Sequence, residues 1–378
     1  MEIISALCEV HPQLRVANLY VRTLKTEKVF SLASVVDNTV CLEESECERR
    51  RLILTFPVST KLLDNYKFKT TSIDGEYIHL RMPIGVPQGV TSGSESTEVL
   101  DLDVLSSSEV KTKTRLYTPS LERTYRIHCA ECQSIFVNSV RFERVLPLPC
   151  TSWTEAASDW YCHQHSGEVK HQKLVPRLND CLFGSSYYAL SANLLTEENL
   201  FSNGKESACT SCQSSVGLIG EGRWNVWCHA IKWTVLENNI WIHKNDATSP
   251  LQSFYFTLYN AMEEDKSFFG RKMVFRDCLD NSKFIILWFI GDNGFTLESS
   301  MESSSETLIK MRPSSLHKIL YRRGNSAGEK IPGDVSEYQI SGQMMSSVLE
   351  VLRNSSEHLP PDCRTAAGFS IGYLSLPS

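Results

Sequence analysis

The sequence predicts an α+β fold rich in β-strands, and three observations support this class. Short runs of β-branched and aromatic residues, separated by turn signals, recur through most of the 378 residues. Two later stretches, residues 250–262 and 343–353, place apolar side chains at helical spacing instead. Several paired cysteines lie between these parts. Because the chain is too long for one ordinary core, we expect an N-terminal β lobe, a central cysteine-rich β region with a short helix, and a C-terminal α+β region.

Residues 1–82 are expected to form the N-terminal β lobe. Three strands are predicted there, at residues 15–22, 51–56 and 77–82. Asp74-Gly75 is typical of a hairpin turn. No catalytic constellation occurs in this lobe, so its predicted role is packing. Residues 83–120 are richer in Pro, Gly and Ser and bury little, which predicts a linker or long loop and the first domain boundary.

The central region, residues 121–245, begins with a strand, a Cys-x-x-Cys turn and a second strand. Ser152-Trp-Thr-Glu155 is a capping box. The apolar residues that follow it keep helical spacing as far as Trp160, so a short helix is expected to end near Cys162. Apolar residues from position 224 to 235 predict one long strand. No internal repeat is evident.

Two Cys-x-x-Cys pairs, at Cys129–Cys132 and Cys209–Cys212, match the ligand set of a four-thiolate zinc site built from two turns. The gap between the pairs is much longer than in a zinc finger, so such a site would join distant segments. The alternative is two unrelated surface turns. We favour the shared site, which makes the central part a zinc-bound β region.

A second group of metal-capable residues lies between the two pairs. Its members are Cys162, His163, His165, His171 and Cys181. They could bind a second zinc ion, although their spacing matches no standard finger. The alternative is a helix end with exposed histidines and one buried cysteine, Cys181.

Residues 246–378 are predicted to form the C-terminal α+β region. Ser249-Pro250 supplies an N-cap and a first-turn proline for one helix. Residues 343–353 are expected to form a second amphipathic helix. Strands are predicted at residues 272–278 and 283–290, from Phe295 onward, and at 369–374.

Composition excludes several classes of function. The net charge of −6 argues against direct binding of nucleic acid, and the longest apolar run, residues 284–290, is too short to cross a membrane. Residues 1–10 lack a signal-peptide pattern, and the odd count of 13 cysteines suits a reducing compartment. No phosphate loop, nucleophile elbow or dinucleotide motif occurs. Three histidines are expected to be isolated strand or loop residues: His128, His229 and His243.

An ordered series of motifs resembles a known family. The series is Cys-x-x-Cys, Arg-Val-Leu-Pro-Leu-Pro, Trp, Trp-x-Cys-His, Asn-Asp-Cys-x-x-Gly, Cys-x-x-Cys-x-x-x-x-Gly and Ile-Leu-Trp, at residues 129–132, 144–149, 153, 160–163, 179–184, 209–217 and 286–288. It is similar to that of the HECT-like ubiquitin-conjugating-enzyme-binding family. The match is strong from residue 125 to residue 217 and fainter toward the C-terminus.

The resemblance implies a ubiquitin-protein ligase of cytoplasm and nucleus that binds ubiquitin and a ubiquitin-conjugating enzyme, the latter through residues 214–237. It also implies a link to mRNA 3′-end processing, through the zinc-dependent endonuclease of the cleavage and polyadenylation machinery. In the family, the segment that here holds Trp153, Trp160, Cys162 and His163 docks onto that endonuclease, so Cys162 could bind the partner's zinc. The alternative is that Cys162 joins His163 and Cys181 in a second zinc site of this chain.

Two functions therefore stay open. A HECT-type ligase carries ubiquitin as a thioester on a reactive cysteine. After Cys278 the chain offers only Cys363 as a candidate catalytic cysteine, and no residue near it in sequence is placed to activate its thiol. The chain is either a ligase, by thioester or by positioning a charged conjugating enzyme, or a non-catalytic binding and assembly factor for the endonuclease.

Overall fold

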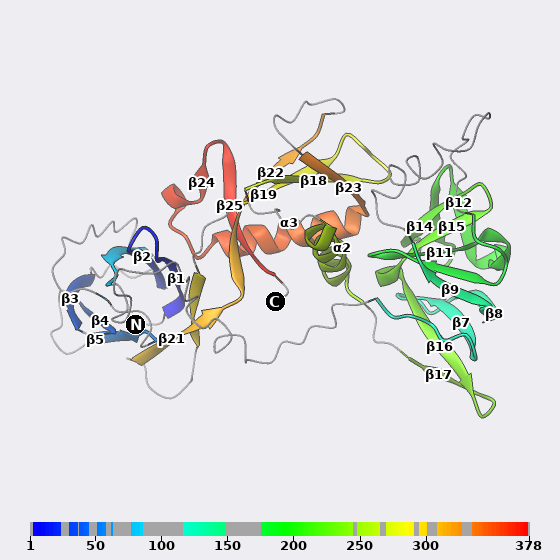
Figure 1. The fold of residues 1–378 in the computed structure, drawn as a ribbon, viewed down its shortest axis with the longest axis horizontal. Helices are drawn as coiled ribbons and strands as arrows, with labels where there is room; N and C mark the ends of the chain where they lie inside the picture. Colours follow the sequence, from blue (N-terminus) through cyan, green and yellow to red (C-terminus); the bar gives the residue numbers. More distant parts are fainter. Residues whose placement is uncertain are drawn as a thin grey trace, which may run out of the picture.

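The computed structural model describes residues 3–23, 30–36, 38–44, 51–57, 62, 77–85, 116–148, 175–244, 248–264, 270–290, 295–300, 308–326 and 335–376. Strands predominate in this part of the chain and two α-helices accompany them, which confirms the β-rich α+β class. Figure 1 shows the C-terminal region in the middle, between the N-terminal lobe and the central region. The predicted helix after Ser152 and the turn at Asp74-Gly75 lie outside the described residues.

The N-terminal lobe is an eight-stranded sheet with the order β3-β4-β5-β21-β20-β1-β2-β6. Alternating apolar residues of these strands, such as Leu19, Leu54 and Leu80, are fully buried in one core cluster. The strands predicted at 15–22, 51–56 and 77–82 are confirmed as β2, β5 and β6. Six strands come from the N-terminal part of the chain: β1 (Ile3–His11), β2 (Val16–Thr23), β3 (Phe30–Val36), β4 (Thr39–Glu44), β5 (Arg51–Thr55) and β6 (Tyr77–Pro83).

Two strands from much later in the chain fill the middle of this sheet. They are β20 (Phe295–Ser300), which pairs antiparallel with β1, and β21 (Leu308–Ser314), which pairs parallel with β5. Within the described residues, β1 and β5 are joined only through β20 and β21. Leu297 of β20 is fully buried in the same core cluster as the strands on both sides. The sheet of the lobe is therefore completed by the C-terminal part of the sequence.

The central region consists of two sheets, with orders β12-β13-β14-β15-β11-β10-β9 and β17-β16-β7-β8. Their shared core is aromatic: Trp233 packs edge-to-face on Tyr125 and Tyr188, and Trp224 on Phe136. The strands are β7 (Thr124–Cys129), β8 (Ile135–Arg141), β9 (Arg144–Pro147), β10 (Asp180–Phe183), β11 (Tyr187–Ser191), β12 (Leu200–Asn203), β13 (Glu206–Cys209), β14 (Ser215–Gly220), β15 (Arg223–Trp227), β16 (Ile231–Glu237) and β17 (Ile240–His243).

The prediction of one long strand over residues 224–235 is wrong. A 3-10 turn, η4 (Cys228–Ala230), divides it into β15 and β16, which belong to different sheets. The amide of Cys228 donates to the carbonyl of Ser186, before β11, whereas the carbonyl of Ala230 accepts from the amide of Ala130, after β7. The chain crosses between sheets here because its backbone is bonded to one sheet before the turn and to the other after it.

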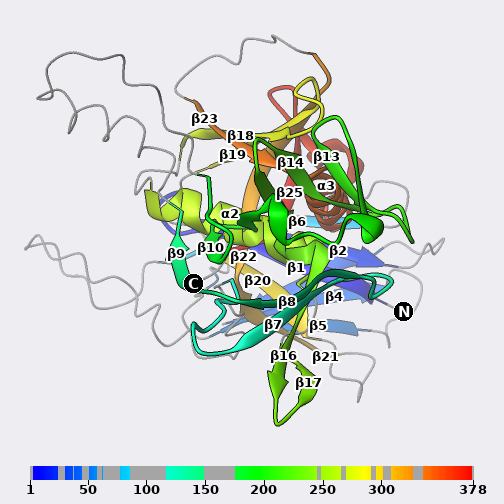
Figure 2. The same ribbon diagram turned by 90° about the vertical axis from the view of Figure 1, so that its right-hand side faces the viewer.

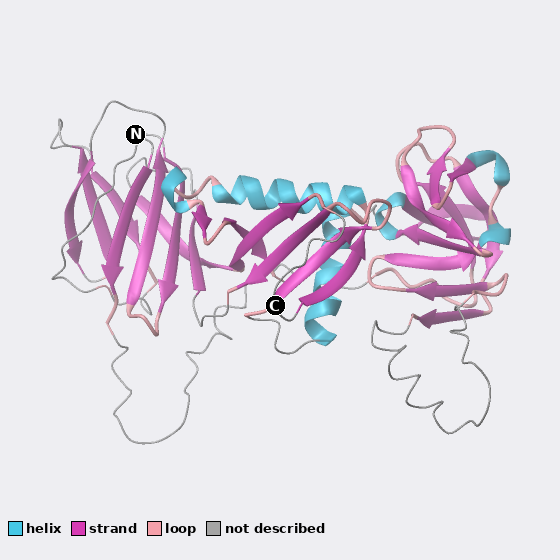
Figure 3. Cartoon of the chain, turned by 90° about the horizontal axis from the view of Figure 1, so that it is seen from above, coloured by secondary structure: helices cyan, strands magenta, loops and turns pink. Residues whose placement is uncertain are grey.

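The C-terminal region is a six-stranded sheet, β23-β18-β19-β22-β25-β24, packed on two helices (Figure 3). Both helices are capped: Ser249 Oγ accepts from the amide of Gln252 at 3.0 Å, and Ser341 Oγ from the amide of Met344 at 3.1 Å. The two predicted helices and the strands predicted at 272–278, 283–290 and 369–374 are confirmed here, whereas the strand predicted from Phe295 is β20 of the N-terminal lobe. The elements are α2 (Pro250–Glu264), β18 (Lys272–Asp277), β19 (Phe284–Phe289), β22 (Leu316–Gly324), β23 (Val335–Ile340), α3 (Gly342–Ser356), β24 (Thr365–Ala366) and β25 (Phe369–Ser375).

Short 3-10 turns occur at η2 (Ala192–Leu194), η3 (Glu197–Asn199) and η5 (Pro361–Cys363). One continuous cluster of buried residues runs from the central sheets to α2, α3 and the C-terminal sheet. No helix of the described residues is long and apolar enough to span a membrane.

A buried carboxylate connects the N-terminal lobe to the C-terminal sheet. Glu9 of β1 accepts a hydrogen bond from the hydroxyl of Tyr373 and lies 2.9 Å from Nζ of Lys318. Burial by itself raises the pKa of Glu9, but His11, Lys318 and Tyr373 outweigh it and lower the pKa to about 2. Apolar residues of both regions, including Leu7 and Leu320, pack around this contact.

Candidate metal centre

The first Cys-x-x-Cys turn follows directly on a strand. Cys129 is the last residue of β7, and Cys132 lies in the turn that leads to β8. The amide of Cys129 donates to the carbonyl of Ser134 at 2.8 Å, and the amide of Gln133 donates to the carbonyl of Cys129 at 3.1 Å. Gln133 has φ of 64°, in the left-handed region that few residues other than glycine adopt. These bonds close a tight turn that holds both cysteines in place.

The second turn repeats the first in sequence and in hydrogen bonding. Cys209 ends β13; its amide donates to the carbonyl of Ser214 at 3.0 Å, and the amide of Gln213 donates to the carbonyl of Cys209 at 2.9 Å. Gln213 has φ of 62°. The two turns read Cys-Ala-Glu-Cys-Gln-Ser and Cys-Thr-Ser-Cys-Gln-Ser. The prediction that the chain has no internal repeat is therefore wrong at the scale of these six-residue turns.

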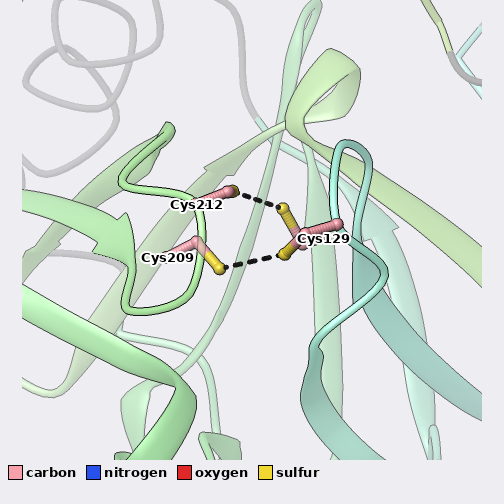
Figure 4. Close-up of side chains that lie close together, drawn as sticks. Cys129, Cys209 and Cys212 are labelled. Atoms are coloured by element: carbon pink, nitrogen blue, oxygen red, sulfur yellow. Dashed lines mark hydrogen bonds between the residues drawn. The ribbon is translucent and has the colours of Figure 1, made fainter.

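The fold brings these two turns face to face, as Figure 4 shows. Sγ of Cys129 lies 3.6 Å from Sγ of Cys212, and Sγ of Cys132 lies 3.5 Å from Sγ of Cys209. All four sulfur atoms lie within 4.8 Å of one another, and none forms a disulfide. Sulfurs at about 2.3 Å from a tetrahedral metal ion are about 3.8 Å apart. The four cysteines therefore fit around a single metal ion.

Serine hydroxyls border the thiols. Oγ of Ser134 lies 3.2 Å from Sγ of Cys132, and Oγ of Ser214 lies 3.0 Å from Sγ of Cys212. The contact with Ser134 lowers the pKa of Cys132 to about 6, whereas burial raises the pKa of Cys129 to about 12. A bound metal would deprotonate all four thiols, so its binding would release protons.

Residues 214–237 follow the second Cys-x-x-Cys turn and contribute strands to both central sheets. They comprise β14, β15, η4 and β16. A Cβ on Gly217 would lie 2.0 Å from the carbonyl oxygen of Asn225, so only glycine fits where β14 meets β15. Trp224 and Trp233 are fully buried, and Leu236 is exposed. The second Cys-x-x-Cys turn thus precedes a stretch of chain that is anchored in the core by two tryptophans and also reaches the surface.

The model of the family "HECT-like Ubiquitin-conjugating enzyme (E2)-binding" matches residues 9–371. The chain belongs to this family. An E3 ubiquitin-protein ligase of Pongo abelii is similar, with 23% identity over 291 residues that cover 66% of this chain and 72% of the relative. The mouse protein of the same name is 22% identical over 273 residues, covering 66% and 70%.

An uncharacterised protein of Saccharomyces cerevisiae is also similar to this E2-binding family member. It is 23% identical over 205 residues, which cover 52% of this chain and 54% of the yeast protein. No solved structure matches the chain significantly. The family resemblance predicted from the ordered motifs is confirmed.

Two of the family motifs meet across a pair of parallel strands. The guanidinium of Arg144, on β9, donates from Nε to Oδ1 of Asp180, on β10, at 2.8 Å. This bond lowers the pKa of Asp180, which also accepts from the amide of Arg177. Parallel neighbours need a long crossover connection, here residues 148–179. The ion pair therefore fixes the two strands between which the segment with Cys162 runs.

Of the remaining predicted site residues, the structure describes Cys181 but not the aromatic and metal-capable residues of the preceding segment. Trp153, Trp160, Cys162 and His163 lie outside the described residues. Cys181 is fully buried in the core, where burial raises the pKa of its thiol. Among the described residues, the only cluster able to hold a metal ion is the four-cysteine one. The second zinc site stays a prediction, and its one described member faces other core residues.

His229 was predicted to be an isolated histidine, and this is wrong. Its Nδ1 lies 3.1 Å from Oγ of Ser253 on α2, and its Nε2 lies 3.0 Å from Oε1 of Gln343 on α3. It borders a cavity of about 270 Å³ between the first Cys-x-x-Cys turn, Ser214 and the start of α2. Burial lowers the pKa of His229 to about 4, so the ring is neutral at pH 7. No local sequence pattern marks this contact, because its three members come from distant segments.

Proposed function

We propose that this chain is a ubiquitin-protein ligase, acting in cytoplasm and nucleus, that binds a ubiquitin-conjugating enzyme and promotes transfer of ubiquitin. The observation that carries the proposal is the E2-binding family match, which spans residues 9–371. Two relatives bear the name of a ubiquitin ligase, and each covers 66% of this chain. We assign the conjugating-enzyme contact to residues 214–237, which emerge from the second metal-binding turn.

The metal in this proposal is zinc, because four thiolates in a tetrahedral arrangement are typical of structural zinc sites. Cys129, Cys132, Cys209 and Cys212 would hold it. Four protein ligands leave no open position for water or substrate, so the ion would supply stability and no catalytic chemistry. Its role would be to hold the start of residues 214–237 against β7 and β8. A conjugating enzyme would then meet a preformed surface.

Ubiquitin transfer is proposed to proceed by positioning the charged conjugating enzyme, without a thioester on this chain. Cys363 is only partly buried, yet burial raises the pKa of its thiol, and Asp362 raises it further. A nucleophilic cysteine needs the opposite shift. Burial also raises the pKa of Cys8, Cys228 and Cys278. Direct attack by the substrate amine on the conjugating-enzyme thioester requires no such cysteine.

The test compares wild type with Cys363→Ser in a reconstituted ubiquitination reaction. We expect equal autoubiquitination and no reductant-sensitive ubiquitin adduct on a non-reducing gel. An adduct that disappears in Cys363→Ser, together with loss of activity in the folded variant, would establish the thioester route instead. Absence of both conjugating-enzyme binding and ubiquitination in the wild type would refute the ligase assignment.

A second candidate is a non-catalytic assembly factor for the zinc-dependent endonuclease of mRNA 3′-end cleavage and polyadenylation. The raised pKa of Cys363 favours it, since a binding factor needs no activated thiol. In this function Cys162 would bind the open position of the partner's zinc, a role that suits a thiolate. Trp153, Trp160 and His163 would contact the partner beside it.

Cys162→Ala tests this second function. Under docking, the variant stays folded with unchanged zinc content and captures less endonuclease than wild type, with Cys41→Ser as the matched control. If Cys162→Ala loses zinc or unfolds, Cys162 is a structural ligand of the chain itself and the docking hypothesis fails.

A further inference from the structure

Within the described residues, the β16–β17 hairpin leaves one edge of its sheet open. β17 pairs with β16, and no other described strand pairs with it. The amide of Lys244 donates to the carbonyl of Trp233 on β16 at 3.1 Å. Because successive amides of a strand point to opposite sides, those of Trp241 and His243 point to the open edge. Figures 1 and 2 show the hairpin extending away from the rest of the central region. Its free backbone groups can therefore pair with another strand.

One side of β17 is apolar. Ile240 is 65% exposed and Ile242 is 40% exposed, and alternation places both on the same side of the strand. The four described strands of this sheet carry one carboxylate, that of Glu237, which pairs with Ile240 across the hairpin. Its Oε1 lies 2.6 Å from Nη1 of Arg123 and 2.8 Å from Nζ of Lys244, so two cations balance its charge. This side therefore favours apolar side chains in an added strand.

The other side of the sheet is cationic. The pairing register places three cations and two aromatic rings on this face: Arg126, Arg141, Lys232, Trp241 and His243. The guanidinium of Arg126 lies 4.1 Å from the centre of the Trp241 ring. None of the described residues in these strands places a carboxylate on this face, although the whole chain has a net charge of −6. The face therefore attracts an anionic segment.

We propose that the edge of β17 binds an extended segment of a partner protein in which apolar residues alternate with aspartate or glutamate. The segment pairs its backbone with Trp241 and His243, which is recognition by strand addition. Because alternate side chains of a strand point to opposite faces, its apolar residues lie beside Ile240 and Ile242. Its carboxylates then lie on the cationic face, where Lys232 of the neighbouring strand is the nearest cation.

This docking edge goes beyond the proposed function. The pairing strand, β17 (Ile240–His243), lies outside residues 214–237, to which the conjugating-enzyme contact is assigned. Strand addition requires only a free backbone edge with suitable side chains on both faces. The proposal therefore stands whether or not the chain is a ligase.

Two other occupants fit the edge less well. A second copy joined through β17 would bring the cationic faces of both copies into one continuous surface, with repulsion between Lys232 and its equivalent. A nucleic acid would match the charge of that face but would leave the β17 backbone unpaired and Ile240 exposed. A segment that alternates apolar and acidic residues satisfies the backbone, the apolar side and the charge together.

Binding of a synthetic peptide to the full-length protein tests the proposal. The peptide is fluorescein-labelled Val-Asp-Leu-Glu-Val-Asp-Leu-Glu, and fluorescence anisotropy measures its affinity. A copy that is N-methylated at every backbone amide keeps the side chains but lacks the donors for strand pairing. We expect this copy, and a copy with lysine at each acidic position, to bind at least about tenfold more weakly. The bound acidic peptide should slow hydrogen exchange at the amides of Trp241 and His243 at least about tenfold.

Substitutions on the two faces of the hairpin locate the contact. Ile240→Asp should lower the affinity at least about tenfold, because it removes an apolar contact and adds a like charge. Leu14→Asp is the matched control, since Leu14 is 71% exposed in the N-terminal lobe. Lys232→Glu should lower the affinity at least about threefold, and more at low salt. Lys205→Glu, at an exposed lysine of the same region, makes the same charge change and should leave the affinity unchanged.

Several outcomes would overturn the proposal. No binding of the acidic peptide, or equal binding of its N-methylated copy, would show that β17 accepts no such strand. Unchanged affinity in both Ile240→Asp and Lys232→Glu would place the contact elsewhere. Exchange at Trp241 and His243 that slows with protein concentration, without peptide, would identify a second copy as the occupant. A single-stranded oligonucleotide that binds more tightly than the peptide and displaces it would identify nucleic acid.

Discussion

The central region and the N-terminal lobe are both completed by segments distant in sequence, but through different chemistry. In the central region, side chains do this: Cys132 and Cys209, 77 positions apart, lie 3.5 Å apart in a four-thiol cluster. In the lobe, backbone hydrogen bonds do this, because β20 and β21 pair with β1 and β5 and so connect them in one sheet. An ion pair between the buried Glu9 and the partly exposed Lys318 adds a second connection. The two regions should therefore fail under different perturbations.

Loss of a metal ligand should destabilise the protein the most, and the destabilisation should be confined to the central region. Structural zinc contributes about 10–16 kcal/mol to the folding of small zinc peptides, and Cys209→Ser removes one of four ligands. We expect the metal content to fall from about one ion per chain to near zero. Limited proteolysis should then cut within residues 175–244 while the N-terminal lobe stays resistant. Cys41→Ser, in β4 of the lobe, is the control that should keep its metal. Full metal content in Cys209→Ser would contradict the four-cysteine site.

The shared sheet of the lobe predicts the next largest effect. Leu297→Ala, on β20, should lower the free energy of unfolding by about 2–5 kcal/mol, because it leaves a cavity in the lobe core. Leu308→Ala, on β21, is the matched control: Leu308 is exposed, and its loss should cost less than about 1 kcal/mol. Denaturant unfolding measures both values. Equal effects of the two substitutions would mean that β20 does not contribute to the core of the lobe.

Glu9→Gln should lower stability by about 2 kcal/mol, because it weakens hydrogen bonds to a charged group at the junction of lobe and C-terminal sheet. The pKa of Glu9 is lowered from 4.5 to about 2 in the folded protein. Its contribution is therefore fully present above pH 4.5 and is lost as the pH falls toward 2. Between these pH values, the melting temperature should fall more steeply with decreasing pH in wild type than in Glu9→Gln. Parallel pH profiles would show that Glu9 does not supply this acid sensitivity.

The smallest change in stability is expected when the two turn glutamines with positive φ, Gln133 and Gln213, are replaced. Gln133→Gly and Gln213→Gly remove backbone strain but add freedom to the unfolded chain, so stability should change by less than about 1 kcal/mol. Metal content should not change. If either variant loses metal, the glutamine side chain has a role in the site beyond its backbone conformation.

Local sequence patterns predicted the helices, strands and metal ligands of this protein better than they predicted which of these contact one another. Ser249-Pro250 marks the start of α2, and the two Cys-x-x-Cys pairs mark the candidate metal ligands, because caps and ligand spacing are short-range features. The contact of His229 with Ser253 and Gln343 escaped prediction, since it joins a 3-10 turn to the starts of two helices. The segment from Trp153 to His163 gave the sharpest hypothesis about a partner, and it lies outside the described residues.

Alternation and motif spacing act within a few residues, so the sequence was enough to predict the β-rich class, some strands such as β2, β18 and β19, and the four clustered cysteines. The sheet that each strand joins became clear only from the folded chain. The apolar pattern runs through residues 224–235 without a break, yet the backbone bonds of Cys228 and Ala230 belong to two sheets. The strand predicted at Phe295 gave no sign that it completes the N-terminal lobe. Strand pairing depends on backbone groups that every residue carries, so side-chain patterns do not specify the partner.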